Sequence, residues 1–196
     1  MSAAARRIAP RALAALLLAA LLWGVAEAIY FFVVADVLLT FIAVAYGWRA
    51  GLSAGLAAAL GAACGGVLMA RLAATDPDQA MALLRSVPFV SEAMIGKGLA
   101  GMAGGDWPLA MLRGSLTGIP YKVFAVGAGR ESIDALAFAA VSVPVRLFRF
   151  VIATSLVAGL SAWLRPRLSL RGRMMLMATF WLVFYGEFWL RWSGGP

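Results

Sequence analysis

The sequence predicts an all-α, polytopic membrane protein with about four to five membrane helices. Hydrophobic residues make up 63% of the 196 residues, charged residues make up 13%, and the mean hydropathy is +0.90. A chain this apolar does not form an ordinary soluble domain. No polar or Gly/Ser-rich linker is long enough to separate two folded units, so we expect residues 1–196 to form a single membrane domain.

The charge balance is strongly basic, with 17 Lys and Arg against 9 Asp and Glu and a net charge of +8. In a membrane protein this excess indicates loops kept in the cytoplasm rather than nucleic-acid binding. Residues 1–11 carry Arg6, Arg7 and Arg11 and are predicted to be the cytoplasmic, basic N-terminus of an uncleaved anchor. The abundance of Ala, Gly and Arg favours a bacterial source, and so a multi-pass protein of the cytoplasmic (inner) membrane.

The absence of histidine and the presence of one cysteine, Cys64, exclude several kinds of chemistry. Cys/His metal sites, Ser-His and Cys-His nucleophilic catalysis and HExxH metalloproteases all need residues that this chain lacks. We therefore expect a protein that is not an enzyme and that uses no cofactor and no metal. Cys64 is expected to be a small packing residue among glycines.

The first apolar stretch, Ala12–Tyr46, contains only two charges, Glu27 and Asp36. It is longer than the ~20 residues that one crossing needs and too short for two crossings with a loop. A tilted, broken or re-entrant arrangement fits this length. The next span is predicted from Leu52 to Ala70.

Small residues recur four positions apart in and beside this second span, at Gly51 and Gly55 and again at Gly61 and Gly65. This spacing lets another helix backbone approach closely. Residues 71–115 that follow are more polar and are predicted to be an interfacial amphipathic segment of short helices. The apolar residues of this segment that suggest such helices are Met81, Leu84, Val87, Met94 and Leu99.

The stretch Leu116–Gly129 combines a break with a buried charge. Gly118 and Pro120 cannot continue a regular helix, and Lys122 lies two residues after Pro120. The stretch is too short to cross a membrane, so a re-entrant segment broken near Gly118-Ile119-Pro120 is predicted. A charge inside the membrane is costly unless it is paired, which makes Lys122 a candidate for a functional site.

A further span is predicted from Leu136 to Trp163, interrupted by Pro144. It carries Arg146 and Arg149 on one helix face, where they either reach an interface by snorkelling or line a cavity with Lys122. The last span is predicted from Met174 to Leu190. The short loop before it is the strongest positive-inside signal of the chain, with Arg165, Arg167, Arg171 and Arg173.

The ionisable residues at membrane depth point to an anionic ligand. Lys122, Arg146 and Arg149 suit a phosphate headgroup, which arginine forks and the N–H groups of a broken helix can hold. Glu27 and Asp36 could neutralise these cations or carry a proton. Transporters commonly place their sites at such breaks near the middle of the membrane.

Four blocks of this sequence follow the order of one family of membrane proteins. They are Glu27 and Asp36 at an E-x8-E spacing, Gly61–Gly66 as G-x-x-x-G-G, Thr117–Phe124 with Ala128-Gly129, and Ser142, Arg146, Arg149 and Phe150 as Ser-x3-Arg-x2-Arg-Phe. On these blocks the chain resembles the DedA family (SNARE-associated or VTT-domain proteins), particularly its YqaA-like branch. Two departures stand out: residues 32–35 lack the prolines of the family pattern, and Gly118 replaces the first proline of T-P-hydrophobic-P-aromatic-K.

The resemblance implies two re-entrant helical hairpins that face each other. It also implies a transporter or flippase that moves a lipid-linked phosphate, such as undecaprenyl phosphate, or a phospholipid between leaflets, with proton coupling. Glu27 and Asp36 would be the acidic pair, and Lys122, Arg146 and Arg149 the cations that face the phosphate. The implied partners are membrane lipids or lipid phosphates and protons.

Two other functions stay open at this point. In a non-transporting scaffold or assembly factor, the small-residue face and the charged pairs would only hold helices together. In an ion or small-solute transporter, the same charges would bind a different cargo. A homo-oligomer also stays open, whereas nucleic acid is not an expected partner.

Overall fold

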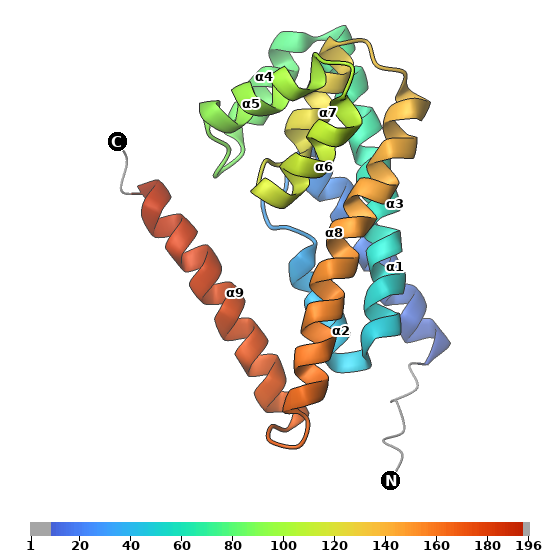
Figure 1. Cartoon of the computed structure of the whole chain (residues 1–196), viewed down its shortest axis with the longest axis vertical. Helices are drawn as coiled ribbons and strands as arrows, with labels where there is room; N and C mark the ends of the chain where they lie inside the picture. Colours follow the sequence, from blue (N-terminus) through green and yellow to red (C-terminus); the bar gives the residue numbers. More distant parts are fainter. Residues whose placement is uncertain (1–8, 194–196) are drawn as a thin grey trace.

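The computed structural model describes residues 9–193, with side chains up to residue 190, so most of the predicted basic N-terminus lies outside the described residues. Within this part of the chain every regular element is an α-helix (Figure 1). The helices are α1 (Pro10–Ile29), α2 (Asp36–Tyr46), α3 (Trp48–Thr75), α4 (Pro77–Ser86), α5 (Glu92–Met102), α6 (Trp107–Thr117), α7 (Tyr121–Arg130), α8 (Ala135–Leu164) and α9 (Leu170–Ser193). The all-α prediction is confirmed.

Three of the described helices are long and apolar enough to cross a membrane: α1, α3 and α8, with 20, 28 and 30 residues. The predicted final span lies in α9, which has 24 residues but a less apolar composition than these three. The chain is therefore built as a helical membrane protein, and a count of four to five membrane helices stays a prediction.

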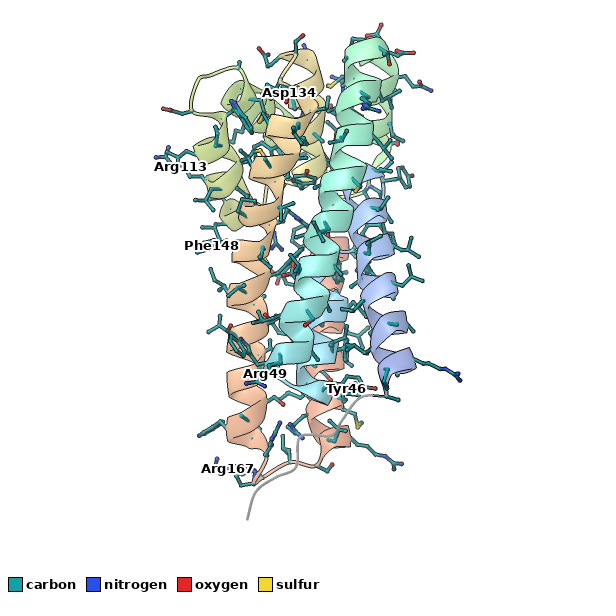
Figure 2. The ribbon with its side chains drawn as sticks, turned by 90° about the vertical axis from the view of Figure 1, so that its right-hand side faces the viewer. Tyr46, Arg49, Arg113, Asp134, Phe148 and Arg167 are labelled. Carbon is teal, nitrogen blue, oxygen red and sulfur yellow. The ribbon has the colours of Figure 1, made fainter. Side chains whose placement is uncertain are left out.

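The first long apolar stretch is broken, as its length predicts. Helix α1 ends at Ile29, and α2 begins at Asp36 and runs back along α3 and α8. Helix α1 begins, and α2 ends, at the end of the bundle that holds Tyr46, Arg49 and Arg167 (Figures 1 and 2). They form the first hairpin of the fold.

The second hairpin enters from the other end. Helix α6 runs from the end that holds Arg113 and Asp134 toward the middle of α8, and α7 returns beside α3 (Figures 1 and 2). The residues between them are Gly118-Ile119-Pro120, so the predicted break is confirmed. Its first arm begins at Trp107, inside the segment predicted as interfacial.

The glycines of α3 explain how closely its neighbours pack. A Cβ atom on Gly61 would collide with the carbonyl oxygen of Leu21 in α1, and one on Gly65 would lie 2.6 Å from the carbonyl oxygen of Val25. Gly51 and Gly55 face α2 and α8 instead. The small-residue spacing therefore provides close contacts to three helices rather than one.

Three further expectations are changed by the structure. Helix α8 continues through Pro144, because the neighbouring turns hold the helix together although one N–H is missing. Cys64 is exposed rather than packed among glycines, since it lies on the outer side of α3. The apolar residues of α4 and α5 face the protein core around Leu84 and Val87, so protein packing accounts for much of their amphipathic pattern.

Helix α9 is joined to α8 by residues 165–169 and leans away from the bundle (Figure 1). Its closest neighbour is α2. Near its start, the Arg173 guanidinium donates to the hydroxyl oxygen of Ser161 at 2.6 Å. Near its end, Phe188 and Trp189 pack against Phe89 of the loop after α4.

Candidate functional site

Two ion pairs connect the first hairpin to α8. An Nη atom of Arg146 lies 2.7 Å from Oε1 of Glu27, and an Nη atom of Arg149 lies 2.9 Å from Oδ2 of Asp36. The Glu27–Arg146 pair is almost fully buried, whereas the Arg149 side chain keeps 27% of its surface exposed. Both arginines lie near the midpoint of the 30-residue α8. Their cavity-lining interpretation, rather than the snorkelling one, fits this position.

The guanidinium of Arg146 is also held by aromatic rings. Its Cζ atom lies 4.7 Å from the ring centre of Phe150 and 5.2 Å from that of Tyr121. The hydroxyl of Tyr121 hydrogen-bonds to the Ser142 hydroxyl at 2.7 Å. Gly66 makes room for this ring, because a Cβ atom there would collide with the Tyr121 hydroxyl.

The break between α1 and α2 contains no proline, and side chains from three other parts of the chain hold it open. Oε2 of Glu27 accepts a hydrogen bond at 2.9 Å from the N–H of Ala35, the residue just before α2. The Tyr185 hydroxyl accepts one from the Val34 N–H at 2.9 Å, and the Trp23 indole donates to the Val33 carbonyl at 2.9 Å. These bonds replace the helical ones that the break removes.

The fourth hydrogen bond at this break comes from Lys122, which has only 3% of its surface exposed. Its ammonium group donates to the carbonyl oxygen of Phe31 at 3.0 Å, which joins the two hairpins at their tips. Within the described part of the chain, Lys122 forms no ion pair with a carboxylate. An ammonium group has three N–H donors, so two remain for a ligand or water.

The break before Lys122 has a backbone cause. Gly118 has φ +88°, in the left-handed region, and the Ile119 N–H bonds back to the Gly114 carbonyl at 3.0 Å, so α6 ends in a tight cap. This φ excludes proline, the residue that the family pattern places at this position. Pro120 then precedes α7, whose first N–H groups have no side-chain cap.

These residues surround one cavity with a volume of about 200 Å³. Four of the five predicted site residues line it: Glu27, Lys122, Arg146 and Arg149. The fifth, Asp36, does not line the cavity and is linked to it only through its ion pair with Arg149. Gly118 and Pro120 also line the cavity, together with the loop after α4 and the end of α9. Residues far apart in the sequence therefore meet here.

Three contributors could not be singled out from the sequence. Tyr185 and Phe188 line the cavity from α9, and Phe89 lines it from the loop after α4. Tyr185 and Phe188 lie in an aromatic stretch that, from the sequence alone, is interpreted as a membrane anchor. Phe89 lies in a polar segment that is interpreted as a loop. Only the hydroxyl of Tyr185 offered a signal, since a tyrosine inside an apolar helix needs a polar partner.

The cavity is not arranged as a metal site. Within residues 9–193, no three side chains of the Cys, Asp and Glu type lie close enough together to hold a metal ion. The lining cations would repel one, since they outnumber the carboxylates.

Comparisons with known proteins identify no relative. No family model matches the chain, and no curated protein or solved structure is significantly similar to it.

Proposed function

We propose that this protein is a membrane transporter that moves a lipid-linked phosphate, or a phospholipid, between the leaflets of a bacterial inner membrane. The observation that supports this most is the charge balance of the cavity. Three cations, Lys122, Arg146 and Arg149, meet two carboxylates, Glu27 and Asp36, within the described residues. One positive charge is in excess at the centre of an apolar protein, and an anion would neutralise it.

The geometry around Lys122 supports an anionic headgroup in particular. Lys122 is the second residue of α7, whose N-terminus has no side-chain cap and whose helix dipole favours a negative charge there. Arg149 is partly exposed, and the N–H groups that it does not use on Asp36 and the Ser115 carbonyl can add a second contact to a phosphate. In this proposal α1–α2 and α6–α7 are re-entrant hairpins that open to opposite faces of the membrane.

The main alternative is a scaffold without transport. The two short, buried ion pairs support it, because such pairs also hold helices in a defined arrangement. The Lys122 bond to Phe31 also joins the two hairpins, but a scaffold has no need for the unpaired positive charge that this lysine places beside a cavity. An ion or small-solute transporter would use the cation but would need no opening toward lipid.

Leaflet exchange in proteoliposomes tests the proposal. A fluorescent lipid phosphate and a fluorescent phosphatidylcholine are compared for wild type, Lys122→Ala and Glu27→Gln. The matched control is Lys97→Ala, because Lys97 is an exposed lysine on α5, away from the cavity. We expect exchange of the anionic probe to fall at least ten-fold for Lys122→Ala and to stay unchanged for Lys97→Ala.

Two results would count against transport. Equal exchange in empty liposomes and in liposomes with wild-type protein would favour the scaffold. Equal exchange by wild type and both cavity variants would mean that lipid moves by a route that avoids Lys122. Glu27→Gln is interpreted only where the purified variant keeps its helical circular dichroism, since it also breaks a buried ion pair.

A further inference from the structure

An apolar groove of about 610 Å³ lies between α2 and α9. Its volume is about three times that of the charged cavity. Its lining is aromatic and aliphatic: Phe32, Val33, Val37, Phe41, Phe89, Ala178, Trp181, Leu182, Tyr185, Gly186 and Trp189. The Trp181 indole N–H is already bonded to Thr40, so it offers no free donor to a polar ligand.

The groove adjoins the charged cavity. Phe32, Phe89 and Tyr185 line both spaces. Tyr185 stands at the boundary, with its hydroxyl bonded to the Val34 N–H and its ring against Phe32 at 6.3 Å between ring centres. One amphiphilic molecule could therefore occupy both spaces, with its charged group near Lys122 and its apolar part along α9.

The direction and opening of the groove fit a chain rather than a compact ligand. From the tip of the first hairpin it follows α2 through Val37 to Phe41, and α9 through Leu182 to Ala178. Leu182 is 73% exposed, so the groove opens sideways to the surroundings of the bundle. In a membrane those surroundings are hydrocarbon, and a lipid chain can enter without first crossing water.

We propose that the α2–α9 groove binds a hydrocarbon chain of the same molecule whose anionic group binds at Lys122. This inference rests on the proposed function, because it takes the charged cavity as the headgroup site. The groove then contributes to selection of the substrate: an anion without a chain, or a chain without an anion, occupies only half of the site.

Gly186 provides a direct test. It lines the groove, and a Cβ atom added to it would meet nothing within 4 Å, so a larger side chain fills the groove without displacing its neighbours. Gly159 on α8 is equally open and exposed but lies outside the groove and the charged cavity. Gly186→Leu and Gly159→Leu therefore form a matched pair of helix substitutions with different consequences for binding.

The probe is hexadecyl phosphate with a photoreactive diazirine in its chain, added to the full-length protein in phosphatidylcholine nanodiscs. We expect cross-links on groove residues of α2 and α9, located by mass spectrometry. Unlabelled hexadecyl phosphate should compete at least ten-fold better than hexadecanol or inorganic phosphate. Gly186→Leu should lower labelling at least five-fold, and Gly159→Leu should leave it unchanged.

The outcomes separate this inference from the proposed function. Cross-links that depend on Lys122, lie outside the groove and are unchanged by Gly186→Leu would show that the groove does not bind the chain. The headgroup site would still stand in that case. Labelling in the groove that hexadecanol removes as well as hexadecyl phosphate would show a site for any bilayer chain and overturn the joint site. Protein–protein cross-links across the groove that Gly186→Leu abolishes would assign it to a second copy. Loss of all specific labelling would overturn both proposals.

Discussion

Arg146 and Glu27, 119 positions apart in the sequence, form a buried ion pair at 2.7 Å. The same carboxylate accepts a hydrogen bond from the Ala35 N–H at the start of α2. Glu27 therefore connects α8 to both arms of the first hairpin. Because it lies next to Lys122 in one cavity, the pair also sets the charge that a ligand meets there.

Removing one partner of this pair should destabilise the protein strongly. Arg146→Met leaves the Glu27 carboxylate buried without its cation, and we expect the free energy of unfolding to fall by about 3–5 kcal/mol. Arg146→Met combined with Glu27→Gln should recover part of that loss, because no charge then stays unpaired. Reversible unfolding of the purified protein in mixed detergent micelles, followed by circular dichroism, measures these values.

The control for this prediction is the exposed ion pair of Arg85 and Glu92, whose side chains are 56% and 69% exposed. Arg85→Met should cost far less than Arg146→Met, since water screens that pair. If Arg146→Met and Arg85→Met lowered the free energy of unfolding by similar amounts, the buried pair would contribute no more to stability than the exposed one.

The sequence predicted the two breaks from different signals, and only the second signal named the residues where the helix ends. Gly118 and Pro120 are residues that end helices, so the second break followed from backbone chemistry. The first break has no such residue. It is made by distant side chains, Tyr185 above all, and a bond between Val34 and a residue 151 positions away cannot be predicted from local sequence.

The candidate site was likewise predictable in its residues but not in their arrangement. The charged members could be selected because ionisable residues are rare in apolar segments. That these charges surround one cavity depends on how α1, α7 and α8 pack, which their helical patterns do not specify. Cys64 shows the reverse case: its glycine neighbours suggested burial, but α3 turns it outward.

Tyr185 should hold α9 against the first hairpin. Tyr185→Phe keeps the ring and removes the hydroxyl that accepts from the Val34 N–H, so a part-buried N–H loses its partner, at a cost of about 1–3 kcal/mol. We expect faster amide exchange at residues 33–35 and a broader distance distribution between spin labels on α2 and α9. Tyr46→Phe is the comparison, since the Tyr46 side chain is remote from the cavity. An unchanged distance distribution would show that the aromatic contacts alone fix α9.

Packing of α1 on α3 should be sensitive to one methyl group. Gly61→Ala places its Cβ atom against the Leu21 carbonyl oxygen, a backbone atom that cannot move aside, and should separate the two helices. We expect a loss of about 1–3 kcal/mol in the micelle unfolding assay. Gly159→Ala, in open space on α8, should be neutral or slightly stabilising. A neutral Gly61→Ala would show that α1 can shift without cost.

Proton coupling should act through Asp36 rather than Glu27. Both oxygens of Glu27 accept hydrogen bonds, whereas Oδ1 of Asp36 is buried with no partner in the described part of the chain. That oxygen lacks a donor, while Arg149 holds the other oxygen of the carboxylate. We expect an imposed pH gradient to accelerate wild-type exchange of a lipid phosphate and to leave Asp36→Asn unaffected. Asp106→Asn, at an exposed position, should respond like wild type. A full response by Asp36→Asn would remove Asp36 from the coupling.

The two ends of the bundle differ in charge, and this difference predicts the orientation of the protein. Arg49 and Arg167 lie at one end with the rest of the arginine-rich loop, whereas Arg113 lies at the opposite end, which also carries carboxylates such as Asp134 (Figure 2). Positive loops stay in the cytoplasm, so the Arg49 end should face it. In a Cys64→Ala background, Pro166→Cys should react with an impermeant maleimide only in inverted vesicles, and Gly104→Cys only in intact spheroplasts. The reverse pattern would invert the topology and, with it, the side from which each hairpin opens.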